Sequence, residues 1–243
     1  PSTRHRTVSA PENADGLALP IGIVVPMAAE YRCLRPLLAH HPQKVLAVRA
    51  GMGPERARRA SRQLVEAGAA ALVSFGFAGG LDPDIGAGTL IVVAEVFEPN
   101  GARVGPLAPV LPNGVVPSDS GAKLLTTRAE VESIAEKAAL HSATGAAAVD
   151  LESFVVAQTA AELGVGFLAI RAVLDGGRRA LPAGLSDCVD EYGQLRAAAF
   201  AGWLTRHPRR ALALPGLAGA EWRAKAALRE AGRRIGDALD RDV

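Results

Sequence analysis

Short apolar runs alternate with amphipathic stretches along most of this chain. Continuous apolar runs at 21–26, 44–51 and 70–80 predict strands that are buried on both faces, since such strands lack polar alternation. Helical spacing of apolar residues follows the first two runs, at 28–40 and 54–68. The third run is predicted to end in a glycine turn, "GFAGG". Strands alternating with helices predict a sheet that is covered by helices on both faces.

The second half of the chain continues the alternation. Its predicted elements are a strand at 88–98, a helix at about 128–140, a strand at 145–150, a helix at 152–164, a strand at 165–175 and two helices at about 186–206 and 217–239. The stretch 99–127, rich in Gly, Pro, Ser and Asn, carries no clear pattern. Because no repeat or linker interrupts the order, we predict a single-domain α/β fold over 20–243, with a mixed β-sheet flanked by helices on both faces. Residues 1–19 are predicted to be a mobile lead-in.

Composition narrows the function classes. The 243 residues include 27 basic and 25 acidic side chains, and a net charge of +2 gives no case for a nucleic-acid partner. Two cysteines far apart predict reduced thiols and a cytoplasmic location. No apolar run approaches the ~20 residues that a membrane-spanning helix needs.

Carboxylates stand at the ends of the predicted strands. Glu30 follows the first strand, Asp150 and Glu152 follow a later one, and Asp175 ends the last. Each acid has an ordinary explanation by itself, such as a helix cap or a turn. Ligands of open α/β sheets, however, bind at the carboxyl ends of the strands. Together with the glycine turn, the acids therefore predict one site at one edge of the sheet.

Four motifs in order resemble the purine nucleoside phosphorylase and nucleosidase superfamily. They are "MAAE" (27–30), "GFAGGLDPDIGAGTLIVV" (76–93), "AVDLES" (148–153) and "FLAIRAVLD" (167–175). Within it, the forms "GxAGGLDP" and "TGAxAVDxES" and the tail "RALPAG…VDEYGQL…RHPRRALALPGLA" are most similar to the hopanoid-associated phosphorylase branch. The resemblance implies a nucleoside phosphorylase-like fold and cleavage of the N-glycosidic bond of a 5′-substituted adenosine. It further implies adenine release from adenosylhopane in hopanoid biosynthesis.

The resemblance assigns the chemistry to three acids. Asp175 is implied to protonate purine N7, for which its pKa must rise from about 3.9. Glu152 is implied to bind the ribose 2′- and 3′-hydroxyls, with Leu151 and Met27 beside the sugar. Glu30 is implied to be the base that activates a water molecule.

Other residues are given supporting roles. The resemblance implies a turn whose backbone approaches base and sugar, made of Gly76, Phe77, Ala78 and Gly79. Arg171 either orients Asp175 or neutralises a buried group of carboxylates. Asp150 is predicted to be a structural helix cap, and Met52 to support the site.

The absence of phosphate-binding arginines predicts that water, not phosphate, is the nucleophile. Phosphorolytic relatives bind phosphate through arginines, and the position of the arginine on the strand before the glycine turn is Ser74 here. The turn position that bears a hydroxyl in those relatives is Phe77, so neither position supplies a cation. A carboxylate at Glu30 would repel phosphate. The residues therefore favour hydrolysis without a cofactor or a metal. Phosphorolysis remains the alternative, with inorganic phosphate as co-substrate and Arg49 or Arg56 as its ligand.

The partner of such a site is a small-molecule or lipid-linked nucleoside. A hopane group predicts an open, apolar 5′ side, lined by Met52, by the segment 99–127, or by helices that carry Trp203 and Trp222. Core packing is the more ordinary explanation of both tryptophans. The Arg-rich C-terminal region adds the hypothesis of peripheral contact with the inner membrane, and the family habit implies a homodimer.

Two other classes stay open. One is a non-catalytic nucleoside-binding module, which the presence of all three acids disfavours. The other is a nucleosidase for methylthioadenosine or adenosylhomocysteine. A dinucleotide enzyme is disfavoured because "GFAGG" is not G-x-G-x-x-G.

Overall fold

The computed structural model describes residues 20–107, 110–111, 115–116 and 122–241, and these form one mixed sheet with helices around it. The predicted lead-in, residues 1–19, lies outside the described residues. The strands are β1 Ile21–Val25, β2 Val45–Arg49, β3 Ala71–Gly80, β4 Leu90–Val93, β5 Val96–Phe97, β6 Arg103–Val104, β7 Leu124–Thr126, β8 Ala148–Asp150 and β9 Gly166–Asp175. The helices are α1 Ala28–His40, α2 Pro54–Glu66, α3 Ile134–Thr144, α4 Ser153–Leu163, α5 Ala197–Arg206, α6 Pro208–Ala211 and α7 Leu214–Asp240, with a 3-10 turn at Ser186–Cys188.

The sheet branches at β3. Strands β2, β1 and β3 run parallel in that order, and β9 pairs in parallel with the other edge of β3. The pairing of β1 with β3 reaches Ser74, and further along β3 Gly79 and Gly80 pair with antiparallel β8. From β8 the sheet continues through β7 and β5 to β6, while β9 also carries antiparallel β4. The carboxyl end of β3 is thus shared by two arms of the sheet.

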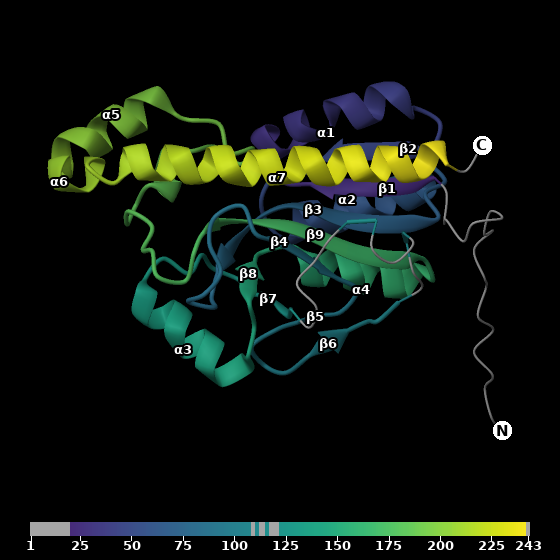
Figure 1. The fold of residues 1–243 in the computed structure, drawn as a ribbon, viewed down its shortest axis with the longest axis horizontal. Coiled ribbons are helices and arrows are strands. Elements are labelled where there is room, and N and C mark those ends of the chain that lie inside the picture. Colours follow the sequence, from purple (N-terminus) through teal and green to yellow (C-terminus); the bar gives the residue numbers. More distant parts are fainter. Residues whose placement is uncertain (1–19, 108–109, 112–114, 117–121, 242–243) are drawn as a thin grey trace.

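Helices cover both faces of the sheet, which confirms the predicted fold class (Figure 1). Helices α1 and α7 pack together over one face, and α2 and α4 pack together over the other. Strand β1 explains why its run is apolar throughout: Ile21, Ile23 and Val25 join the core under α1 and α7, whereas Val24 joins the core under α2 and α4.

Helix α7 is long because its apolar stripe follows the sheet to the end. Its buried residues recur every three or four positions, at Ala220, Ala224, Leu228, Ala231, Ile235 and Leu239. Trp222 lies outside this stripe and is 68% exposed, so core packing is the wrong explanation for it. Trp203 on α5 is buried and donates its indole N–H to the Ala183 carbonyl at 3.1 Å. Among the described residues, no helix is both long and apolar enough to span a membrane.

The predicted glycine turn is wrong: residues 76–80 continue β3 instead of turning. They stay extended because β9 pairs alongside as far as Gly79, and β8 pairs with Gly79 and Gly80. A β-bulge falls between Ala78 and Gly79. Gly76, Phe77, Ala78 and Gly79 therefore present strand backbone, not a loop, to the site.

Other boundaries also differ from the prediction. The strand predicted at 88–98 is divided into β4 and β5. Helix α3 begins at Ile134, because the Ser133 hydroxyl caps it by accepting the Glu136 N–H at 3.1 Å. The helix predicted at 186–206 is helical only from Ala197, after the short 3-10 turn.

Candidate active site

A cavity lies where β1, β3, β8 and β9 end, next to the branch of the sheet. Its volume is about 690 Å³, a figure that includes the solvent at its open mouth. The cavity is lined by these residues that the sequence proposed: Met27, Glu30, Met52, Phe77, Ala78, Gly79, Leu151, Glu152, Arg171 and Asp175. Asp150 lines it too, and Gly76 lies behind Glu30 and Arg171. The structure thus brings the predicted set together in one place.

Glu30 is held by two backbone amides. Its carboxylate accepts the Met27 N–H at 2.7 Å, which closes the first turn of α1, and the Phe77 N–H of β3, also at 2.7 Å. The side chain is 2% exposed. Burial raises the pKa of Glu30 to about 7, although Arg171 and the two amides act in the opposite direction. A buried carboxyl with this pKa can exchange a proton near neutrality.

Gly76 makes room for that carboxylate. A Cβ at this position would lie 2.4 Å from Glu30 Oε1 and 2.7 Å from Arg171 Nη1. Both distances are far below normal contact, so any side chain here would displace Glu30, Arg171 or both. Gly76 is therefore required by close packing and not by a turn.

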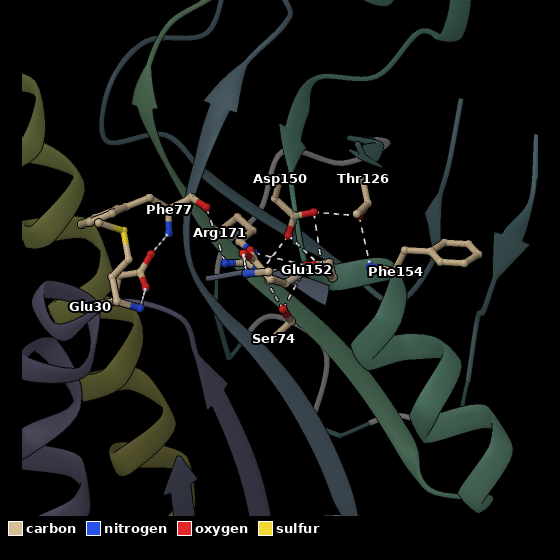
Figure 2. Close-up of polar contacts among 11 residues, drawn as sticks. Glu30, Ser74, Phe77, Thr126, Asp150, Glu152, Phe154 and Arg171 are labelled. Carbon is tan, nitrogen blue, oxygen red and sulfur yellow. Dashed lines mark hydrogen bonds and ion pairs between the residues drawn. The ribbon is translucent and has the colours of Figure 1, made fainter. Parts of the chain in front are cut away.

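Arg171 and Asp150 form the centre of the polar network in Figure 2. The guanidinium Nη2 lies 2.7 Å from Asp150 Oδ2 and 3.9 Å from Glu152 Oε2, and it donates to the Ser74 hydroxyl at 2.7 Å. The Ser153 hydroxyl accepts further bonds from Arg171 at 3.1 and 3.2 Å. Of the two roles predicted for Arg171, these contacts favour neutralisation of buried carboxylates.

Asp150 also organises the start of α4, as expected of a cap. Its carboxylate accepts the N–H of Ser153, the first residue of the helix, at 3.1 Å. It accepts the Thr126 hydroxyl at 2.7 Å, and that hydroxyl in turn accepts the Phe154 N–H at 3.1 Å (Figure 2). Asp150 thus combines the predicted structural role with an ion pair to Arg171 that the sequence did not indicate.

Glu152 points into the cavity from the start of α4. It is 5% exposed, and its Oε1 accepts the Gly53 N–H at 3.0 Å. Burial raises the pKa of Glu152, and Arg171 opposes that shift while neighbouring Asp150 adds to it. Gly53 has φ +106, so only glycine fits the backbone that places this amide against Glu152.

Asp175 meets a partner that sequence reasoning missed. Lys137 on α3 contacts Asp175 Oδ2 through its Nζ, and both side chains are buried. Burial raises the pKa of Asp175 to about 6, although the Lys137 ammonium acts against this shift. The sequence predicted a helix at about 128–140, but a lysine in a helix carries no sequence signal that it is buried.

Arg49 and Arg56, which the sequence offered as phosphate ligands, do not line the cavity, and Ser74 supplies no cation. Ser74 is buried, and its hydroxyl is engaged by Arg171 and Ser153. Arg49 stacks 4.6 Å over the ring of Tyr192, and Arg56 lies 4.0 Å from Glu191. Among the described residues, the cation that lines the cavity is Arg171.

A second, largely apolar cavity adjoins the first. The two share five lining residues, namely Met27, Phe77, Glu130, Leu174 and Leu181. The second continues past Leu185, Val189 and Leu217 to the start of α7. The segment 99–127, predicted to line the 5′ side, contributes Thr127 to the first cavity, while its buried Val110, Leu111 and Val116 join the core under α1 and α7.

The fold is that of known nucleosidases. The structure resembles a mutant of the Helicobacter pylori 5′-methylthioadenosine/S-adenosylhomocysteine nucleosidase with 5′-methylthioadenosine in its active site. The sequence identity is 15% over 93% of this chain and 100% of that chain, and the TM-score is 0.62. The Neisseria meningitidis enzyme of the same name, in complex with methylthio-immucillin-A, gives 17% identity over 87% and 97% and a TM-score of 0.59. Futalosine hydrolase of Helicobacter pylori gives 17% identity over 63% of this chain and 86% of that chain, with a TM-score of 0.54.

Sequence comparison adds a narrower match. A model of the phosphorylase superfamily matches residues 25–120, which include Glu30 and all of β3. A search of curated proteins finds no match. The motifs around Glu152 and Asp175 lie outside the matched stretch.

Proposed function

We propose that this protein hydrolyses the N-glycosidic bond of a 5′-substituted adenosine and releases adenine. The observation that carries the proposal is the meeting of three buried carboxyl groups, those of Glu30, Glu152 and Asp175, in one cavity. Burial of three acids costs stability, and perturbed acids gathered in a cavity are typical of catalytic sites.

Each acid has a step that its surroundings suit. Cleavage leaves positive charge on the ribose and negative charge on the purine. Asp175 donates a proton to purine N7 as the bond breaks, Glu152 accepts hydrogen bonds from the ribose hydroxyls, and Glu30 takes a proton from the attacking water. A base with a pKa of about 7 is well matched to that last step.

Charge favours water over phosphate as the nucleophile. Of the residues that line the cavity, five are acids (Glu30, Glu130, Asp150, Glu152 and Asp175) against one cation, Arg171. That guanidinium is already bound to Asp150 and Ser74. A phosphate dianion needs several donors, and here it would meet net negative charge. The same charge stabilises a ribosyl cation.

For the substrate, we propose adenosylhopane, an adenosine with a large, rigid apolar group on its 5′ carbon. The adjoining apolar cavity supports this choice, because it would accept such a group beside the sugar. Methylthioadenosine is the alternative substrate, since nucleosidases with that activity share the fold.

A lipid-linked substrate suits contact with a membrane. Leu212 is 82% exposed beside α6, close in sequence to Arg206, Arg209 and Arg210. Apolar and cationic side chains in proximity favour anionic lipid surfaces. We propose peripheral contact through this end of the molecule, and sedimentation with phosphatidylglycerol vesicles tests it: no co-sedimentation would refute it. The homodimer that we also propose is tested by analytical ultracentrifugation.

The activity is tested by adenine release from adenosylhopane and from methylthioadenosine, each with and without phosphate. Wild type is compared with Asp175→Asn and with Asp84→Asn, a matched change at an exposed carboxylate. We expect phosphate-independent release that Asp175→Asn lowers about 10²–10⁴-fold, with no change in Asp84→Asn. A strict phosphate requirement would overturn hydrolysis, and release from methylthioadenosine alone would overturn the lipid substrate. No release from either would leave a nucleoside-binding module.

A further inference from the structure

Helix α3 is unusual because the one residue that it buries is a lysine. Lys137 is fully buried, whereas the apolar Ile134 of the same helix is 47% exposed. Moving an ammonium out of water is expensive unless all its hydrogens find acceptors. An apolar side chain would fill this position without the free-energy cost of desolvating an ammonium group, so the burial of Lys137 requires another explanation.

The ammonium group has three acceptors, one for each hydrogen. They are Asp175 Oδ2, the Arg179 carbonyl at 2.8 Å and the Gly176 carbonyl at 3.4 Å. Lys137 does not line the cavity, whereas Asp175 does. Both carboxyl oxygens of Asp175 lie by the cavity-lining Gly79, where a Cβ would be 3.6 Å from Oδ1 and 3.9 Å from Oδ2. Asp175 thus connects the buried lysine to the cavity.

This arrangement conflicts with Asp175 acting as a simple acid. A carboxyl group that accepts a hydrogen bond from an ammonium is held as a carboxylate, which has no proton to give. The charged groups that face it are Lys137 from α3 and Arg179 from the segment after β9, and both favour the carboxylate. The cavity acids Glu30, Glu130 and Glu152 contribute opposing charge.

We propose that Lys137 is a positioning residue that delivers a proton to purine N7 through Asp175. This step rests on the proposed nucleosidase function. An N–H bond of the Lys137 ammonium breaks as an O–H bond forms on Asp175 Oδ2. The carboxyl group then rotates about its Cβ–Cγ bond so that this O–H faces the purine, and the O–H bond breaks as N7–H forms. The electron pair of the glycosidic bond passes to the purine. Lys137 is left as an amine and regains a proton from solvent, while Glu30 loses to solvent the proton that it took from water.

A proton relay and a plain counter-ion role for Lys137 predict opposite shifts of the alkaline limb of the kcat profile when Lys137 is replaced. If Lys137 only stabilised the Asp175 carboxylate, its removal would raise the pKa of Asp175 and shift the alkaline limb of the kcat profile to higher pH. If Lys137 supplies the proton, its removal leaves Asp175 as the last source, and the limb shifts to lower pH. Arginine keeps the charge but cannot release a proton, so Lys137→Arg should show the largest downward shift.

The test uses kcat profiles from pH 5 to 9 for wild type, Lys137→Met, Lys137→Arg and, as a matched control, the exposed Lys123→Met. Each is assayed on methylthioadenosine, or on adenosylhopane if that alone is cleaved, and on 4-nitrophenyl β-D-ribofuranoside, whose leaving group departs without protonation. We expect Lys137→Arg to lose about 100-fold in kcat on the purine substrate at pH 8 and less than about tenfold at pH 5. Nitrophenol release should be unchanged, which also shows that the variant is folded.

Wild type alone provides a measurement that does not depend on variant folding. The relay requires purine cleavage to persist well above the Asp175 pKa of about 6. An alkaline limb near pH 6, an upward shift in Lys137→Met, or equal losses on both substrates would each overturn the relay. A wild-type protein that releases neither adenine nor nitrophenol would instead overturn the proposed function, so the two failures are distinguishable.

Discussion

Replacing Arg171 by methionine tests whether one buried cation holds the site together. The change keeps a long, unbranched side chain but removes the guanidinium that pairs with Asp150 at 2.7 Å and bonds to Ser74 and Ser153. Asp150 and Glu152 would remain buried with their charge uncompensated. The loss is therefore expected to come from the stranded carboxylates more than from the lost bonds.

The magnitude follows from the burial of both partners. The side chains of Arg171 and Asp150 are each 1% exposed. Breaking a pair of this kind costs about 3–5 kcal/mol, a large share of the roughly 5–15 kcal/mol that stabilises a domain. For a chain of this length, that corresponds to a Tm lower by about 6–20 °C. The matched control is Arg178→Met, whose pair with Asp84 is exposed and contributes at most about 1 kcal/mol.

The assay is urea unfolding of wild type, Arg171→Met and Arg178→Met at pH 8 and pH 5. Arg171 lowers the pKa of both Glu30 and Glu152, so these pKa values rise in the variant. A carboxyl group with a raised pKa in the folded state lowers the stability of the protein as pH rises through that pKa. The loss in free energy of unfolding caused by Arg171→Met should therefore be larger at pH 8 than at pH 5. A deficit no larger than that of Arg178→Met, or one that grows toward pH 5, would refute the reasoning.

Two further substitutions test the packing and charge around Glu30. The pKa of Glu30 is about 7 in the folded protein, above the ordinary 4.5. The stability contributed by protonated Glu30 is therefore complete below pH 4.5 and is lost as pH rises through 7. In wild type this lowers the free energy of unfolding by roughly 3 kcal/mol between pH 5 and pH 8, and Glu30→Gln should abolish that decrease in urea unfolding. An equal fall in Glu30→Gln would show that other groups cause it. Gly76→Ala should reduce adenine release at least about tenfold because its Cβ would collide with Glu30 and Arg171, whereas Gly219→Ala on α7 meets only ordinary contacts and should leave the rate unchanged. Equal rates in both glycine variants would contradict the close packing.

Periodicity predicted the fold because each face of the sheet has its own apolar partner. The run 21–26 lacks alternation because its odd and even positions face two different helix layers, and α7 shows the spacing of a helix with one buried stripe. The missed boundaries are those decided by tertiary pairing. Glycines at 76–80 favour a turn locally, but neighbours on both edges keep them in β3.

The positions of the site acids were predictable because they end strands, whereas their ion-pair partners on other elements of the fold were not. Glu30 and Asp175 follow apolar strands, which places them at the sheet edge without any knowledge of contacts. The Lys137 partner of Asp175 comes from a helix 38 positions earlier in the chain. Arg171 was placed correctly on its strand, but its preference for Asp150 depends on how β8 and β9 meet at the branch, which spacing does not encode.

The branch at β3 explains why so many acids share so little positive charge. Because β8 takes up the end of β3 beyond the reach of β1, the start of α4 is brought against β9, and Asp150 and Glu152 both reach Arg171. One guanidinium cannot neutralise two carboxylates and also Glu30, so burial raises the pKa of Glu30 and Glu152 despite it. Asp175 lies apart with its own cation, Lys137. In the proposed mechanism, the cavity therefore separates a base with a pKa near neutrality, Glu30, from an acid, Asp175, that has its own cation.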